Sequence, residues 1–264
     1  MPVPETTPAE DLDLLIAAAR TAGTIAQQHF RANPEIWQKG DESPVTEADI
    51  AIDRVLRTDL LAARPGYGWL SEETEDDAER LDDDRVFILD PIDGTRAFID
   101  GQDSYAHALA VAEHGRVIAG VVYLPEKDKL YAAARDLGAT LNGQPIRASA
   151  QRSEAGAQLL ATKPTMKEAH WPGGIPPVKR VYRPSLAYRM ALVAEGHFDG
   201  MATFRPTWEW DIAAGAILIE ESGGIVTDGH GRDLRFNRRH PQADGVLTAS
   251  PGLHAALLGR RRTA

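Results

Sequence analysis

Two carboxylates follow an apolar run in the segment "ILDPIDGTRAF", residues 88–98. Asp90 and Asp93 are separated by three positions across a turn, so their side chains can converge on one point. Pro91 restricts φ and helps to keep Asp90 extended. Acids at the end of a buried strand are costly unless a cation neutralises them, and oxygen ligands favour a hard cation such as Mg²⁺. The segment predicts a Mg²⁺ site, with simple capping of a turn as the alternative.

The residues after these acids have the types that a phosphate site needs. Gly94 permits a close approach of the backbone, and Gly94-Thr95 would begin a helix, whose free N–H groups attract phosphate. Acids beside a phosphate make sense only with cations between them. Ile92 stands where an EF-hand calcium loop needs an acid. It also interrupts the Asp-x-Asp pattern of phosphatases that form an aspartyl phosphate, so both of these classes are excluded.

Other acids lie in separate segments that could join this turn. Glu72, the first of two adjacent glutamates, ends a predicted strand, "YGWLSEE". Asp211 lies in the first turn of a predicted helix, "WEWDIAAGAILIEESGG", beside two tryptophans. Asp49 follows Thr46 by three positions as a capping pair. Taken singly, Asp211 is also explained by the helix dipole and Asp49 by capping alone.

The elements that must position these acids differ between the two halves of the chain. In the first half, helical spacing predicts helices over residues 9–31 and after Thr46, and long strands and a hairpin turning at His114 and Gly115 indicate α+β character. The second half alternates short strands with helices at about 185–195 and 209–222, which indicates an α/β layer. We therefore predict two domains, 1–139 and 140–264. The segments "KGDESPVTEAD", "TEDDAERLDDD" and "RDLRFNRRH" are predicted to be a loop and two stretches of solvated charge.

Composition narrows the possible functions. The 264 residues are 43% hydrophobic and 26% charged, as in an ordinary soluble protein, and the net charge of −10 argues against nucleic-acid binding. Absence of cysteine excludes disulfides and thiolate chemistry. No apolar run approaches the roughly 20 residues of a membrane span, and the acidic start "MPVPETTPAEDLDLL" lacks a signal-peptide pattern. We expect a cytoplasmic protein with no membrane partner.

Four segments together resemble a known family. "SPVTEAD", "WLSEE", "DPIDGTRAF" and "WDIAAGAILIEESGG", in this order and spacing, resemble the motifs of the inositol monophosphatase superfamily, which comprises Mg²⁺-dependent, lithium-sensitive phosphatases of small molecules. The resemblance spans nearly the whole chain. It implies a layered αβαβα sandwich of mixed α+β and α/β character, two to three Mg²⁺ ions per active site, a small phosphorylated metabolite as substrate, and a homodimer.

The resemblance also implies a set of metal ligands. Glu72 and Asp90 would bind one Mg²⁺ together with the backbone carbonyl of Ile92. Asp90, Asp93 and Asp211 would hold a second ion, and a third, looser ion would touch the Glu72 region, which makes Glu72 a catalytic residue as well.

Further roles follow from the same resemblance. Thr95, with Asp49 behind it, corresponds to the pair that orients and deprotonates a water for in-line attack without a covalent intermediate. The amides of Gly94 and Thr95 would cradle the phosphate. Lys39 and Asp41 would belong to a mobile loop that closes near the active site and helps to hold the third ion, although a solvated loop is the simpler interpretation.

The predicted substrate wall departs from the common pattern. Where many members have Gly-Ser-x-Ala, this chain has "YRPSLAYRM", in which Ser185 fits and Arg183 replaces a smaller residue. Arg183 could bind a second phosphate bidentately or be a surface cation. Glu209, just before Asp211, is predicted to contact the hydroxyls of a polyol.

These features predict a phosphatase acting on a sugar or polyol monophosphate such as myo-inositol phosphate. A 3'(2'),5'-bisphosphate nucleotidase of sulfur assimilation and a histidinol-phosphate phosphatase are the alternatives with the same chemistry. Thr95 and Asp49 are both present, which argues against a non-catalytic metal-binding homologue. The compact loops argue against a fructose-1,6-bisphosphatase.

Overall fold

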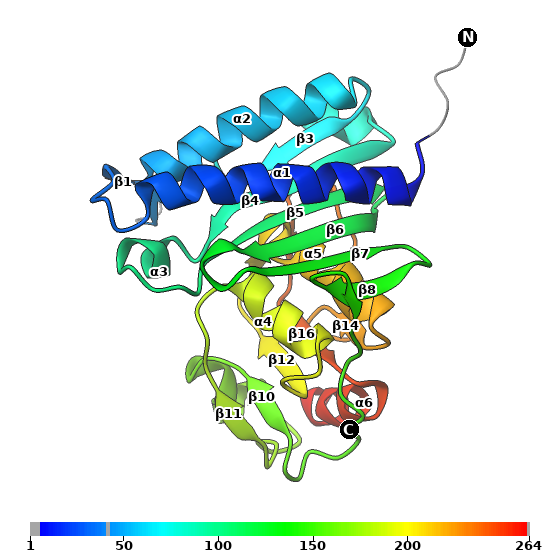
Figure 1. The fold of residues 1–264 in the computed structure, drawn as a ribbon. Helices are drawn as coiled ribbons and strands as arrows, with labels where there is room; N and C mark the ends of the chain where they lie inside the picture. The colour runs from blue at the N-terminus through cyan, green and yellow to red at the C-terminus, as the bar shows by residue number, and fades with distance from the viewer. Residues whose placement is uncertain (1–5, 41–42, 263–264) are drawn as a thin grey trace.

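The structure is a computed structural model that describes residues 6–40 and 43–262, and its helices and sheets alternate in layers (Figure 1). Two long helices cover one face of a large sheet, two more lie between this sheet and a smaller one, and the last covers the far face of the smaller sheet. The predicted αβαβα sandwich is therefore confirmed. The helices in these layers are α1 (Pro8–His29) and α2 (Glu47–Ala63), α4 (Leu186–Ala194) and α5 (Glu209–Glu221), and α6 (Pro251–Arg261).

The large sheet is seven-stranded, and its strands follow the order of the sequence. The first two strands are parallel and the others antiparallel. The predicted domain boundary after residue 139 falls inside β8, so the sheet continues to Pro145. The strands are β3 (Gly68–Ser71), β4 (Arg85–Asp93), β5 (Ala106–Glu113), β6 (Arg116–Leu124), β7 (Lys129–Ala134), β8 (Gly138–Leu141) and β9 (Gln144–Pro145).

Alternation along the central strands explains how both faces of this sheet are covered. In β5, Leu109 and Val111 point to the cluster under α1, whereas the alanines between them point to α4 and α5. Small residues on that face let α5 lie close. At Gly120 in β6, an added Cβ would lie 2.7 Å from Cγ2 of Ile217, so no larger residue fits under the helix.

The small sheet is five-stranded and mixed, in the order β11-β10-β12-β16-β14. Its two faces belong to different apolar clusters, one shared with α4 and α5 and the other with α6. The strand β11 was not predicted. The strands are β10 (Gln158–Leu160), β11 (Lys179–Val181), β12 (Gly200–Thr203), β14 (Ile225–Thr227) and β16 (Val246–Ala249), and a separate pair is formed by β13 (Thr207–Trp208) and β15 (Gln242–Ala243).

Three segments predicted to be loops or solvated charge are more ordered than expected. Part of "KGDESPVTEAD" forms β2 (Pro44–Thr46), which pairs antiparallel with β1 (Ile36–Gln38). In "TEDDAERLDDD", Arg80 is only 2% exposed, because its guanidinium binds Asp76, the side chain of Asn237 and the carbonyl of Arg238. The last two residues belong to "RDLRFNRRH", so the two charged stretches dock on each other.

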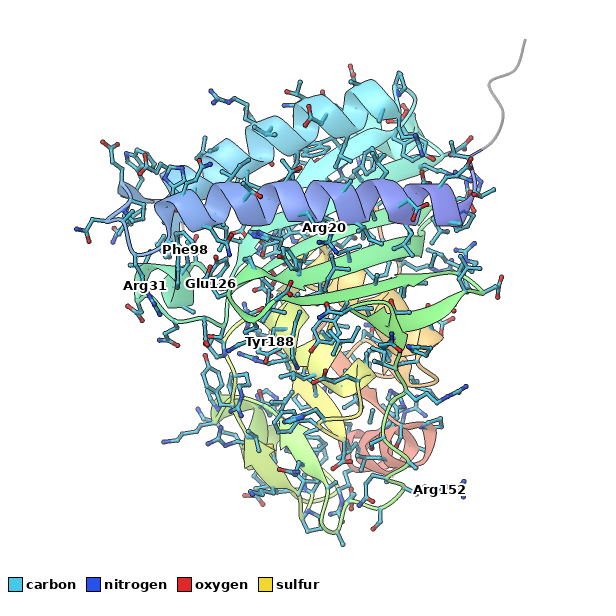
Figure 2. All side chains as sticks on the ribbon, in the orientation of Figure 1. Arg20, Arg31, Phe98, Glu126, Arg152 and Tyr188 are labelled. Atoms are coloured by element: carbon cyan, nitrogen blue, oxygen red, sulfur yellow. The ribbon has the colours of Figure 1, made fainter. Side chains whose placement is uncertain are left out.

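Aromatic contacts hold the short helix that begins beside the predicted site. The short helix α3 (Thr95–Ile99) follows β4 directly, and Figure 2 shows Phe98 turned from α3 toward the end of α1. The Phe98 ring lies 5.5 Å from that of Phe30 and 4.9 Å from that of Tyr105. These contacts anchor α3 to the layer above.

Within residues 6–40 and 43–262, the helices all lack the length or the apolarity to span a bilayer.

Candidate active site

Three buried or half-buried carboxylates from three elements meet at the carboxyl end of β4. Oxygens of Glu72, Asp90 and Asp211 all lie within 4.8 Å of one another. Glu72 lies beside Asp90 because β3 and β4 are parallel and the N–H of Glu72 continues their ladder to the carbonyl of Leu89, at 3.2 Å. Asp211 comes from the first turn of α5, which packs against β4. Segments that are distant in sequence thus form one acidic cluster.

A β-bulge gives β4 the local shape of this site. Asp90 pairs with Ala108 and Asp93 with Ala106, so two residues of β4 oppose the single residue His107. Bulges redirect side chains and are frequent beside active sites. Gly94 then takes a φ of 96°, which favours glycine, before α3 begins.

Asp93 connects this turn to α4. Its Oδ2 accepts hydrogen bonds from Ser185 Oγ, at 2.7 Å, and from the N–H of Ala187, at 2.6 Å. Ser185 is the N-cap of α4, and its Oγ also accepts from the N–H of Tyr188. The first turn of a helix attracts a carboxylate, so these two bonds tie the end of β4 to the start of α4. Ser185 lines the pocket described below, but its hydroxyl is already committed to Asp93.

Burial and mutual repulsion make the acidic cluster unfavourable without a cation. Burial raises the pKa of Asp90 well above its ordinary value, and the charges of Glu72 and Asp93 raise it further. Burial and the charge of Asp93 also raise the pKa of Asp211 well above its ordinary value. Burial raises the pKa of Asp93 to about 6 in spite of its hydrogen bonds. A divalent cation would reverse this effect, and the oxygen-only donor set fits a hard ion such as Mg²⁺.

One lysine reaches into the cluster from the β1–β2 hairpin. Lys39 Nζ lies 2.8 Å from Glu72 Oε1 and 2.7 Å from Glu73 Oε1. Burial lowers the pKa of Lys39, but the charges and hydrogen bonds of Glu72 and Glu73 have the larger effect, so its pKa is raised above the ordinary value. Burial and the charge of Glu72 raise the pKa of Glu73 to about 7. Lys39 of the predicted mobile loop therefore lies at the acids, whereas Asp41 lies outside the described residues.

Thr95 and Asp49 lie at the edge of the cluster without bonding to each other. Thr95 Oγ1 donates to the carbonyl of Ile92, at 3.1 Å. Asp49 Oδ2 accepts from the N–H and hydroxyl of Thr46, which confirms the predicted capping box. Its Oδ1 is buried and has no hydrogen-bond partner among the described residues. A buried carboxylate oxygen needs a donor, and the described residues supply none to Oδ1.

A pocket of about 330 Å³ opens beside these acids. The arginines and aromatic side chains that line it were not among the predicted substrate contacts. Arg189 is only 8% exposed, and its guanidinium lies 4.9 Å from the ring centroid of Tyr182. Trp208 and Trp210 stack with a centroid distance of 4.7 Å and an interplanar angle of 10°. The available signal was the position of Arg189 one helical turn after Ser185, on the same face. The lining also includes Arg96 and Arg205.

The structure places Arg183 and Glu209 outside the lining of this pocket, and for Arg183 it agrees with the alternative of a surface cation. The guanidinium of Arg183 is exposed, donates to the carbonyl of Tyr182 and lies outside the lining of the pocket. Glu209 is 1% exposed, and its carboxylate accepts from the N–H of Asn237, at 2.6 Å, and of Arg238, at 3.1 Å. It therefore holds the 237–238 loop instead of facing the pocket.

Comparison with known proteins decides the family. The model of the family described as "Inositol monophosphatase family" matches residues 8–264. The chain belongs to the inositol monophosphatase family. The predicted membership and reaction class are thus confirmed, since this family consists of metal-dependent phosphatases.

Similar members of the inositol monophosphatase family carry more than one activity. The inositol-1-monophosphatase of Rhizobium meliloti is 33% identical over 83% of this chain and 86% of its own length. The histidinol-phosphatase of Chlorobaculum parvum is 32% identical over 94% of this chain and 95% of its own. An inositol monophosphatase structure from Zymomonas mobilis superposes with a TM-score of 0.81 at 28% identity, covering 97% of this chain and 99% of that one.

Proposed function

We propose that this protein is a Mg²⁺-dependent phosphomonoesterase whose substrate is a polyol phosphate such as inositol monophosphate. The observation that carries the proposal is the convergence of Glu72, Asp90 and Asp211 within 4.8 Å on the wall of the pocket. The similarity to an inositol-1-monophosphatase supports the substrate class. Mg²⁺ bound at these acids supplies charge neutralisation and activates water.

The residues around the acids have complementary tasks in this proposal. The hydroxyl of Thr95 donates to Ile92, so its lone pairs are left to accept a hydrogen bond from the attacking water. Asp49 takes the proton from that water, because its Oδ1 is uncommitted and burial raises its pKa to about 6, close to neutral pH. The backbone N–H groups of Gly94 and Thr95 bind the phosphoryl oxygens.

A panel of phosphate esters tests the proposal. Phosphate release is measured with Mg²⁺ from inositol 1-phosphate, adenosine 3',5'-bisphosphate, histidinol phosphate and fructose 1,6-bisphosphate, with EDTA as the control. We expect the highest kcat/KM for inositol 1-phosphate and no release in EDTA. Turnover that EDTA leaves unchanged would contradict the role of the acidic cluster.

A specific observation favours a second candidate, the 3'(2'),5'-bisphosphate nucleotidase. Arg189, Arg205 and Arg96 line the pocket, and guanidinium groups bind phosphate well. The rings of Trp208 and Tyr182 offer apolar faces to a base. The same cations disfavour histidinol phosphate, whose amine is positive. A kcat/KM for adenosine 3',5'-bisphosphate above that for inositol 1-phosphate would establish this candidate instead.

Four finer properties belong to the same proposal. We propose two to three Mg²⁺ ions per site, inhibition by millimolar lithium, a homodimer and a cytoplasmic location. The carboxylate oxygens of the acidic cluster support the binding of Mg²⁺ ions. Titration calorimetry with Mg²⁺, lithium inhibition curves, light scattering after gel filtration, and cell fractionation test the four in turn.

A further inference from the structure

The β-bulge at the acids shifts the register between β4 and β5. Pro91 and Ile92 together oppose His107, so the ladder between β4 and β5 is interrupted at these positions. An unpaired carbonyl in a buried segment is costly, and all of β4 is buried. The imidazole Nδ1 of His107 forms a hydrogen bond to the carbonyl of Pro91 within the bulge. A side chain of β5, that of His107, thus binds a backbone carbonyl of β4.

The same peptide is also held on its other side. The carbonyl of Pro91 and the N–H of Ile92 belong to one planar unit. The N–H of Ile92 donates to Asp90 Oδ1, at 2.9 Å. A rotation of this peptide would move both bonds together. His107 therefore holds the plane of the peptide whose N–H binds the Asp90 carboxylate.

The environment of His107 leaves the ring one protonation state and no room to rotate. The side chain is fully buried between Tyr105 and Tyr123, whose ring centroids lie 5.9 and 6.3 Å away. A carbonyl can only accept, so Nδ1 carries the proton and Nε2 does not. Burial lowers the pKa of His107 to about 4, so the ring is neutral at pH 7. Nε2 has no hydrogen-bond partner among the described residues, so the Pro91 bond is the polar contact that holds the ring.

We propose that His107 is a positioning residue for the cation site: through the Pro91–Ile92 peptide it sets the orientation of the Asp90 carboxylate. This inference rests on the proposed Mg²⁺ site. Partners of metal ligands orient them, and their loss typically weakens metal affinity about 10- to 100-fold. Because His107 acts through one peptide, we expect the lower end of this range.

Two variants of equal shape isolate the hydrogen bond. Asparagine carries an N–H donor at the same covalent distance from Cβ as Nδ1 of histidine, and leucine has the same branching without a donor. His107→Asn and His107→Leu therefore both remove the ring and keep its branching, and only asparagine retains a donor for the carbonyl of Pro91. His107→Gln moves the donor one carbon further. The Mg²⁺ dissociation constant of the metal-free protein is measured for each by titration calorimetry, and the Tm of each is recorded in EDTA.

We expect His107→Asn to bind Mg²⁺ with nearly the wild-type dissociation constant and His107→Leu to bind about tenfold more weakly. A purely structural role would lower the Tm in EDTA and leave the two dissociation constants equal, and that result would overturn the inference. If His107→Leu does not fold, His107→Gln is compared with His107→Asn, and equal affinities would again overturn it. Failure of the wild-type protein to bind Mg²⁺ would contradict the proposed function itself.

Discussion

Replacing Asp49 by asparagine should make the metal-free protein more stable while removing its activity. Asp49 is 1% exposed and lies near the acidic cluster. Asparagine can still accept the bonds from Thr46 through its own oxygen, so the capping box of α2 persists. What the substitution removes is a buried negative charge.

The size and the pH dependence of this effect follow from the pKa of Asp49. Burial raises that pKa from 3.8 to about 6, and the bonds from Thr46 only partly offset it. The folded protein thus holds the proton more tightly than the unfolded chain. The cost of ionisation is absent below pH 3.8, grows up to pH 6 and is constant above it. Two pKa units correspond to about 3 kcal/mol, of which about half has developed at pH 5.

Urea unfolding in EDTA measures this prediction. At pH 7.5 we expect the free energy of unfolding of Asp49→Asn to exceed that of the wild type by about 3 kcal/mol, and at pH 5 by about half as much. Asp59→Asn, at an exposed position of the same helix, is the control and should change little. With Mg²⁺, kcat should fall at least about 100-fold, because an amide cannot accept the proton. An asparagine variant that is less stable than the wild type, or whose advantage does not shrink at pH 5, would refute the reasoning.

Three further substitutions test the site. Asp90→Asn should nearly abolish turnover and the Mg²⁺-induced rise in Tm while leaving the circular dichroism spectrum unchanged; substantial remaining activity would contradict the metal assignment. Thr95→Ala should lower kcat more than it raises KM, because the hydroxyl acts on the attacking water, and a change in KM alone would argue against that role. Arg189→Met should raise the KM for adenosine 3',5'-bisphosphate about tenfold, which is the effect of one lost charged hydrogen bond. The KM for inositol 1-phosphate should rise less. Equal effects on both substrates would show that Arg189 binds no second anionic group.

The acidic motifs were predictable because their chemistry is local. Asp90 and Asp93 stand in a turn whose proline restricts the backbone and whose glycine permits a positive φ, and Asp211 stands in the first turn of a predicted helix. The order of such motifs along the chain sufficed to predict the family and the layered fold. The capping box of Thr46 and Asp49 was likewise predicted correctly, since its partners are three residues apart.

Arg183 and Glu209, which lie outside the pocket, are residues whose orientation depends on distant segments. Arg183 and Arg189 lie in the same motif, and the chain alone does not tell which one the pocket receives. Packing of α4 turned Arg189 inward and left Arg183 exposed. Glu209 was turned toward Asn237 and Arg238, which no local pattern connects to it.

The sequence by itself determined which residues carry charge, where helices and strands begin, and which acids belong to the site, because these follow from residue type and short spacing. Only the tertiary structure decided which cations line the pocket and that His107 completes the bulge beside Asp90. The physical reason is that the direction of a side chain is fixed by packing and hydrogen bonds between segments far apart in the chain. Such contacts exist only once the layers have assembled.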